Sequence, residues 1–239
     1  MEMEMQHRIM GYDRTATMFS PDGRLLQVEY AEKTVKLGSA SIGFLCSDGV
    51  VIVADRRPID NLVILAKGMK VWQVDEHIIA SAAGILSDAR VLIERAQIVA
   101  QQHRVTYDEP ASVETVVRDI ADIQQSATQY AGARPFGVEI MIAGIDKNDE
   151  PKLYVSEVTG NYCAYRAAAI GENDEKIKEM LRKVKEVPTI DKAIKIALNI
   201  FKKILGRSFD ITRFEAAYVK KKERKARRIE GKALSKYIR

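Results

Sequence analysis

Histidine and cysteine most often ligate metals or carry redox chemistry, and this sequence holds few of either. The histidines are His7, His77 and His103, and their separations match no zinc or haem motif. Cys46 and Cys163 lie far apart in apolar runs, which indicates small core residues in a reducing cytosol. The sequence therefore predicts no metal site, no cofactor and a cytoplasmic location.

Basic residues gather at the end of the chain. The net charge is +5, but residues 220–239 hold ten Lys/Arg and two Asp/Glu, so residues 1–219 carry −3. The run KKKERKARR would suit a nucleic acid. It has no interleaved aromatic residues and no nucleic-acid-binding module, so the sequence favours a solvated turn and no nucleic-acid partner. A weak contact with an acidic partner stays open.

The composition is that of a soluble globular protein with one substantial core, since 46% of the 239 residues are hydrophobic and 30% are charged. No run of about 18 apolar residues predicts a membrane span. The leader MEMEMQHRIM is acidic and has no apolar stretch, so we expect a mobile tail and not a secretory signal. Residues 1–11 are taken as this segment, and residues 12–239 as a single domain without internal repeats.

Blocks of helix and blocks of strand alternate along the chain. Helices are expected to begin at Leu25, Ser87, Ser112, Asp174 and Ile190; the last two end at Val187 and Leu205, and a short helix ends near Tyr237. Strands are expected at 39–46, 49–55, 70–74, 77–83, 136–146, 151–158, 162–171, 214–220 and 226–230. Grouped blocks of this kind favour stacked layers over a doubly wound sheet. The fold class is therefore α+β, a four-layer αββα sandwich.

The most distinctive pattern lies between Tyr12 and Gly38. Residues 15–19 suit an extended segment, and Ser20-Pro21-Asp22-Gly23 is a turn, because Pro fixes φ and Gly accepts positive φ. The helix that follows is apolar on more than one side and stops at Gly38. We expect it to pack against a neighbouring molecule, and packing on its own core is the alternative.

Within this segment, YDR, FSPDGRL and QVEYA form the signature that opens the α subunits of the 20S proteasome, and the chain resembles archaeal members along nearly its whole length. The resemblance implies the Ntn-hydrolase fold with an N-terminal extension helix, in a non-catalytic subunit of a threonine endopeptidase complex. Such subunits form seven-membered rings that cap β rings, gate substrate entry and dock an unfolding ATPase. The implied partners are other α subunits, β subunits, a proteasome-activating AAA ATPase and unfolded proteins in transit, without a membrane.

The same resemblance places three residues at positions of the catalytic β-subunit site. Ser39 corresponds to the nucleophilic threonine, Asp55 to its acidic partner and Lys70 to its lysine. Without cleavage Ser39 has no free amine, and the residues after Gly171 do not match those that complete the site. We therefore expect no catalytic residue and a vestigial site.

An autoprocessed N-terminal-serine hydrolase, cleaved between Gly38 and Ser39, is the alternative from another functional class. Such cleavage would remove the signature segment. If Asp55 is buried, it needs a partner, for which Arg56, Arg57 or a nearby lysine is expected.

Four residues match the family's gate cluster: Tyr12, Asp13, Pro21 and Tyr30. The resemblance implies that they meet between subunits when the entrance is open, with residues 1–11 as the plug over the pore. Two phenols, a carboxylate and a fixed turn can form a hydrogen-bonded and stacked group. Ordinary core aromatics are the alternative for the two tyrosines.

Lys70, Gly84 and Ile85 match the pocket that receives the C-terminal tail of the ATPase regulator. An ammonium is a compact donor for a terminal carboxylate, and a glycine allows close approach. Without the resemblance, Lys70 would be a solvated strand lysine and Gly84 a turn.

The run YAGARPFG resembles the family loop that narrows the axial channel, which makes Tyr130, Ala131, Gly132 and Ala133 the expected pore loop. Ala131 replaces a glycine, and alanine tolerates positive φ poorly. Arg134 is held extended before a proline, so we expect it to brace the loop.

Overall fold

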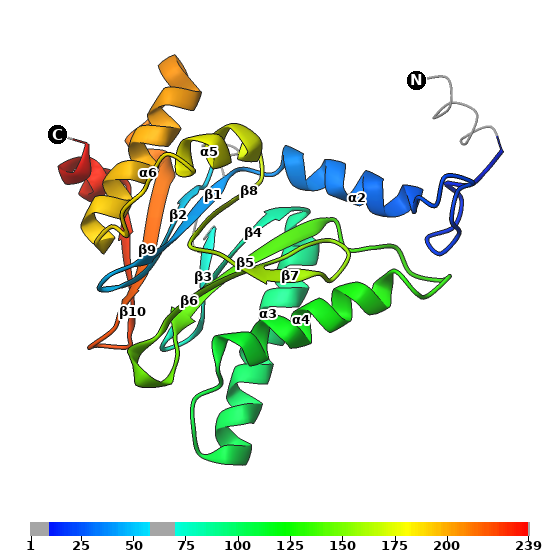
Figure 1. Ribbon diagram of the computed structural model, residues 1–239, viewed down its shortest axis with the longest axis horizontal. Helices are drawn as coiled ribbons and strands as arrows, with labels where there is room; N and C mark the ends of the chain where they lie inside the picture. Colours follow the sequence, from blue (N-terminus) through cyan, green and yellow to red (C-terminus); the bar gives the residue numbers. More distant parts are fainter. Residues whose placement is uncertain (1–9, 58–69, 239) are drawn as a thin grey trace, which may run out of the picture.

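Two antiparallel sheets face each other and helices cover their outer sides, which makes four layers (Figure 1). The computed structural model describes residues 10–57 and 70–238. Its α-helices are α2 (Leu26–Leu37), α3 (Leu86–Tyr107), α4 (Val113–Ala127), α5 (Asp174–Leu181) and α6 (Ile190–Leu205). Its strands are β1 (Ser41–Cys46), β2 (Gly49–Asp55), β3 (Val71–Asp75), β4 (Ile78–Gly84), β5 (Val138–Ile145), β6 (Pro151–Ser156), β7 (Tyr162–Ala164), β8 (Ala167–Ile170), β9 (Phe214–Lys220) and β10 (Ala226–Glu230). The predicted αββα sandwich is confirmed.

The strand order is β10-β9-β2-β1-β8 in the first sheet and β3-β4-β5-β6-β7 in the second. The predicted hairpins β1–β2 and β3–β4 both form; Cys46 pairs with Gly49 in the first, and the register shifts between Gln73 and Asp75 in the second. All seven residues of β2 are buried. Its sequence is apolar at nearly every position because the sheet is covered on both faces.

The stretch 162–171 corrects a prediction, because it forms two strands in different sheets and not one. The backbone N–H of Tyr165 donates to the carbonyl of Leu153 in the second sheet, at 2.8 Å. The carbonyl of Arg166 accepts from the N–H of Leu45 in the first sheet, at 2.9 Å. The chain therefore changes sheet between these residues. Periodicity could not reveal this, since it does not identify the sheet with which an apolar run pairs.

Apolar side chains fill the three spaces between the layers. The space between the first sheet and α5–α6 holds Phe44, Ile194, Phe201 and Phe214 among others. The space between the sheets holds Ile52, Ile79, Met141 and, from α2, Val28, Ala31 and Val35. The space between the second sheet and α3–α4 holds Leu92, Val117, Ile120 and Ile140. The helix α2 is thus part of the chain's own core.

The helix α2 ends where predicted, but for a different reason. Gly38 follows it with φ −70° and ψ 147°, an extended conformation and not the left-handed cap that glycine often supplies. A Cβ on Gly38 would lie 2.3 Å from the backbone nitrogen of Gly84. Glycine is therefore required for the close passage of the chain past the end of β4.

Two helix starts were predicted from capping residues, and one of them is wrong. The N-cap of α3 is Ile85, without a side-chain hydrogen bond, so Ser87 lies inside the first turn. The hydroxyl of Ser112 does cap α4, where it accepts from the N–H of Thr115 at 3.1 Å.

The predicted helix 174–187 is shorter than expected. The helix α5 ends at Leu181, and Val187, which precedes Pro188, is exposed. The N–H groups of Lys183 and Val184 donate to the carbonyls of Met180 and Leu181, three residues earlier, so the chain leaves the α-helix in tighter turns before it reaches Pro188. The short terminal helix is a 3₁₀ helix, η4 (Gly231–Tyr237).

The two cysteines differ in burial. Cys46 is buried, and burial raises the pKa of its thiol. Cys163 is exposed on β7, an edge strand, so the prediction that both are core residues is wrong for it.

Candidate functional site

Close backbone contacts join the end of α2, the end of β4 and the start of β5. Gly84 has a φ of +125°, and a Cβ there would lie 2.1 Å from the carbonyl oxygen of Gly137. That carbonyl accepts from the backbone N–H of Ile85 and from the hydroxyl of Thr34, both at 2.9 Å. The predicted docking residues Gly84 and Ile85 therefore lie beside the helix of the signature segment.

Among the described residues, no hydrogen bond or ion pair links Ser39, Asp55 and Lys70 to one another. Ser39 is bonded through its nitrogen to Gly38, whose carbonyl accepts from the N–H of Glu172 at 2.8 Å. The carboxylate of Asp55 is 4% exposed and accepts two hydrogen bonds, at 2.7 and 2.5 Å, from the guanidinium of Arg213. This carboxylate is occupied by a charged partner.

The partner of Asp55 is not one that the sequence predicted. Arg56 and Arg57 instead form ion pairs with Glu230 and Glu172. The backbone N–H of Arg57 does donate to Asp55, at 3.0 Å. The true ion-pair partner, Arg213, lies 158 residues further along the chain, directly before β9.

Lys70 is held through its backbone and buried. Its N–H and that of Val71 donate to one carboxylate oxygen of Glu215, at 2.5 and 2.6 Å. Its carbonyl accepts from the hydroxyl of Ser81 at 2.8 Å. Lys70 is 5% exposed, and this burial lowers its pKa to about 8, while the negative charges of Asp55 and Glu215 act in the opposite direction.

Glu215 was not singled out from the sequence, although it belongs to this site. Glu215 is fully buried, and this burial raises the pKa of its carboxyl. The two backbone N–H groups that donate to the carboxylate act in the opposite direction. Its other carboxylate oxygen has no hydrogen-bond partner within the described residues. A single acidic residue inside the apolar strand FEAAYVK was the signal that could have identified it.

Two of the four predicted gate residues meet in the single chain. The hydroxyl of Tyr30 donates to the carboxylate of Asp13 at 3.4 Å, and the amide of Gln27 donates to the carbonyl of Asp13 at 2.5 Å. Tyr12 is half-buried in the adjoining turn, whereas Pro21 is exposed. The segment before α2 is thus tied to the first turns of that helix.

A cavity of about 140 Å³ connects the three predicted regions of the site. It lies between α2, the start of α3 and the loop before β5. Its lining residues are Gln27, Tyr30, Ala31, Thr34, Ile85, Arg134, Pro135 and Gly137. A gate tyrosine, a docking residue and the base of the pore loop therefore share one cavity.

The predicted pore-loop residues project from the domain. Tyr130, Ala131, Gly132 and Ala133 are all exposed, and the N–H of Ala133 donates to the carbonyl of Tyr130 at 3.1 Å. Ala131 does not have a positive φ, so alanine is accommodated without strain.

Arg134 braces the loop, as predicted. Its guanidinium donates two hydrogen bonds to the carboxylate of Asp88 on α3, at 2.7 and 2.8 Å. The same carboxylate accepts from the N–H of Gly137 at 3.0 Å. The Arg134 guanidinium is the main cause that holds the pKa of Asp88 below its usual value.

The described residues contain no group of three or more His, Cys, Asp or Glu side chains placed to hold a metal ion. None of the described helices is both long and apolar enough to cross a bilayer.

Comparisons with known proteins match two parts of the chain. Residues 35–219 match the family model of proteasome subunits, and residues 12–33 match the model of the N-terminal signature of A-type proteasome subunits. A protein of Pyrococcus abyssi that is named as a proteasome alpha subunit is 40% identical over 95% of this chain and 87% of its own length. Proteins named in the same way from Archaeoglobus fulgidus and Methanocaldococcus jannaschii are 40% and 44% identical, over 96% and 80% of this chain and 93% and 74% of their own lengths.

Proposed function

The chain belongs to the proteasome α-subunit family, and from this premise we propose that it is a non-catalytic subunit of a proteasome core particle. It assembles with other α subunits into a seven-membered ring that caps a ring of β subunits. Its relatives are named as proteasome alpha subunits, and its own N-terminal signature is of the α type.

The position of α2 is the observation that carries the non-catalytic assignment. An active N-terminal serine requires the loss of all residues before Ser39. Val28, Ala31 and Val35 are buried in the space between the two sheets. Loss of the segment would expose these side chains and the core residues that they cover, at a cost of about 1.5–3 kcal/mol for each buried valine. Retention of the segment therefore favours the fold, and it keeps the nitrogen of Ser39 in a peptide bond.

Intact mass and activity test this assignment together. The purified chain should keep its full mass, and it should hydrolyse fluorogenic peptides no faster than background. Ser39→Ala should leave the activity of a complete particle unchanged. A mass that begins at Ser39, or a loss of activity in an assembled Ser39→Ala particle, would instead establish the N-terminal-serine hydrolase.

Electron microscopy of the purified chain tests the ring. We expect single or stacked rings with sevenfold symmetry. A stable monomer at micromolar concentration, in the presence of β subunits, would contradict the assembly role.

We propose a gating role for the N-terminal segment, supported by the contact of Asp13 with Tyr30 and by the signature match. Deletion of residues 1–11 should speed the degradation of unfolded proteins without an ATPase, and affect short peptides little. Unchanged protein degradation in a correctly assembled particle would exclude this role.

We propose that Lys70, Gly84 and Ile85 receive the terminal carboxylate of a regulator. A docked carboxylate would recover a hydrogen-bonded partner for the buried ammonium, worth about 1.5–3 kcal/mol in each pocket. Since the tails of a ring dock together, Lys70→Ala should nearly abolish ATPase-stimulated degradation. Asp55 keeps its pairing with Arg213, so the variant should still assemble.

The pH dependence sharpens this test. The ammonium of Lys70 is lost as the pH rises through its pKa of about 8. Binding of a regulator tail peptide should therefore weaken between about pH 7 and 9. Binding that is unaffected by both the pH and the Lys70→Ala substitution would exclude the docking role.

A further inference from the structure

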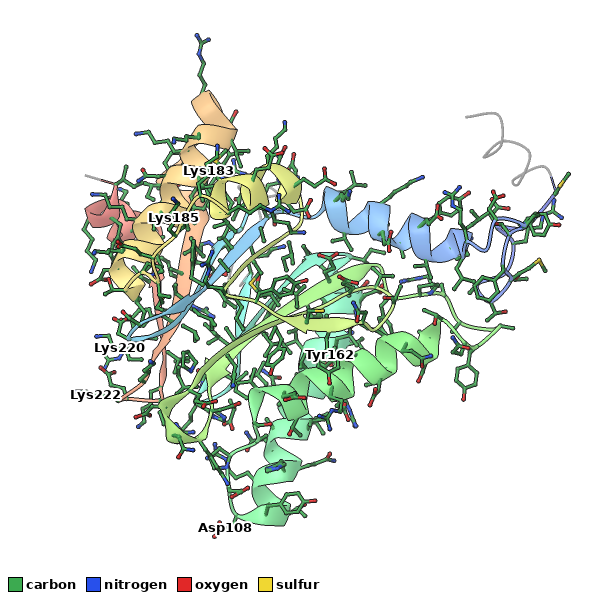
Figure 2. The ribbon with its side chains drawn as sticks, viewed as in Figure 1. Asp108, Tyr162, Lys183, Lys185, Lys220 and Lys222 are labelled. Carbon is green, nitrogen blue, oxygen red and sulfur yellow. The ribbon has the colours of Figure 1, made fainter. Side chains whose placement is uncertain are left out.

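The outer face of α6 and of the connection before it is strongly basic. Residues 182–207 contain eight Lys/Arg and two Asp/Glu, and all eight basic side chains are exposed. We call the following residues the basic face: Arg182, Lys183, Lys185, Lys192, Lys195, Lys202, Lys203 and Arg207. Figure 2 shows Lys183 and Lys185 in the region of α5 and α6, far from Lys222 at the tip of the β9–β10 hairpin.

Acidic residues neutralise this face only in part. Residues 182–207 contain Glu186 and Asp191 against eight basic residues, which leaves a balance of +6, and the carboxylate of Asp191 also accepts a hydrogen bond from the hydroxyl of Tyr237 at 2.9 Å. Apart from Lys195, the residues of the basic face form no ion pair with any residue in the ranges that the structure describes, 10–57 and 70–238. Protein surfaces normally intersperse both signs, so an excess of one sign over residues 182–207 is the first observation that favours a binding role.

The electrostatics of α6 explain only part of the cluster. Lys202 and Lys203 lie in its last turn, where the helix dipole favours a positive charge. Lys192 lies in the first turn, where the dipole disfavours it. Arg182 caps the C-terminus of α5 and Lys183 follows it, so the dipole of α5 favours these two charges. Lys192 is therefore the charge that opposes helix stability, and the eight basic residues of the face exceed what the two helix ends explain.

A cavity next to the N-terminal part of the basic face is mainly aliphatic with a cationic rim. It measures about 230 Å³ and is lined by Tyr165, Arg166, Ala167, Ala168, Lys178, Leu181 and Arg182. The guanidinium of Arg166 donates to the carbonyl of Val184 at 3.3 Å, which ties the rim to the connection that carries Lys183 and Lys185. Lys178 is paired with Asp174 at 2.6 Å, so Arg166 and Arg182 supply the excess positive charge at the rim.

We propose that the basic face is a docking surface for an acidic polypeptide segment, with one aliphatic side chain of that segment seated in the cavity beside Arg182. The exposed lysines attract the acidic residues, and Leu181 and Ala167 provide the apolar wall. This role goes beyond ring assembly and gating and does not require either of them.

The chemistry favours a polypeptide over a nucleic acid. Single-stranded nucleic acids bind to basic surfaces that also expose aromatic rings for base stacking. The exposed large aromatic residues among the described ones are Phe19, Tyr107 and Tyr130, and none of them lies in residues 182–207. One aromatic ring, that of the half-buried Tyr165, lines the cavity beside Arg182, but the other apolar walls are leucine and alanine, which suit an aliphatic side chain.

Fluorescence anisotropy with the full-length protein, in its native assembly, tests the proposal. The probes are a labelled peptide of about ten glutamates, the same peptide with a central leucine, and a single-stranded oligonucleotide of similar length. The test variant carries Lys183→Gln, Lys185→Gln and Lys192→Gln. The control variant carries Lys222→Gln, Lys225→Gln and Lys232→Gln, which removes the same charge elsewhere.

We expect the leucine peptide to bind more tightly than the all-glutamate peptide, and more weakly as salt rises. The test variant should bind it about tenfold more weakly, and the control variant less than about twofold more weakly. The melting temperature of the test variant should be unchanged or higher, because the substitutions remove repulsion; a loss of binding then cannot come from unfolding.

Equal losses in both variants would overturn the proposal, since binding would then follow net charge alone. Tighter binding of the oligonucleotide, lost in the test variant, would assign the face to nucleic acid instead. Equal binding of the two peptides would overturn the role of the cavity.

Discussion

The two helical layers of the sandwich bury similar apolar stripes but have different outer faces. The layer of α3 and α4 carries matched ion pairs on its surface, which are Arg90–Glu94, Arg95–Asp119 and Arg118–Glu114. It also exposes Val91, Ile98 and Val105, spaced seven residues apart. The layer of α5 and α6 has the pair Lys178–Asp174 on α5, but it also exposes the basic face, where eight basic residues stand against two acidic ones. The inner stripe is fixed by packing against a sheet, whereas the outer charge pattern is free to follow a partner.

The largest expected effect tests whether the two inner stripes are equivalent. Ile120 on α4 and Ile194 on α6 are both fully buried. Replacement of either by alanine should cost about 2–5 kcal/mol of unfolding free energy, from lost burial and from the cavity created. Urea denaturation at one fixed protein concentration measures both, with the half-exposed Ile98→Ala as the control, expected within about 0.5 kcal/mol of wild type. A cost below about 1 kcal/mol for Ile194→Ala alone would show that α6 is loosely packed.

The next largest expected effect concerns the polar contacts that attach each helical layer to the rest of the fold. Asp75 on β3 is buried and accepts two hydrogen bonds from Arg104 of α3, at 2.9 and 2.8 Å. Asp75→Ala should cost about 2–4 kcal/mol, because it leaves the guanidinium without its partner. Asp191 of α6 is exposed and accepts from the neutral hydroxyl of Tyr237, so Asp191→Ala should cost about 1 kcal/mol or less. If thermal unfolding gives similar losses of unfolding free energy for the two variants, both layers depend equally on these polar contacts.

Acid sensitivity should reside in the α3 layer. The pKa of Asp88 is lowered in the folded protein by Arg134, so its contribution is complete above the unfolded pKa of about 3.9 and is lost as the pH falls through the folded value. Asp88→Asn should therefore cost about 1–2 kcal/mol at pH 6 and less near pH 3. Asp191→Asn is the matched control in the other layer. If both variants keep the pH profile of the wild type, the Asp88–Arg134 pair does not determine acid stability.

The smallest expected effect is a change in unfolding free energy that has opposite signs on the two outer faces. Arg90→Gln removes one partner of a helical ion pair and should destabilise by a few tenths of a kcal/mol. Lys192→Gln removes a positive charge from the first turn of α6 and should stabilise by a similar amount. Both differences can be resolved by repeated denaturation curves at low salt, and they should shrink as salt is added. The same sign for both would contradict the difference in electrostatics between the layers.

Features that depend on neighbours within a few residues were determined by the sequence alone. The alternation and length of the apolar runs predicted both N-terminal hairpins, and the stripe of Val28, Ala31 and Val35 predicted a buried face of α2. The capping role of Ser112 and the bracing role of Arg134 also followed from local chemistry. The sequence motifs between Tyr12 and Ala31 led to the family.

Features that depend on distant segments were decided only by the tertiary structure. The sheet change between Tyr165 and Arg166 follows from which strands stand at each edge, which no local pattern encodes. The need for glycine at residue 38 comes from the backbone of Gly84, and the partner of Asp55 lies 158 residues away. A buried charge requires a partner, but any of the chain's many arginines and lysines satisfies that requirement equally well in sequence. The packing of the sheets selects the one that is close enough to form the bond.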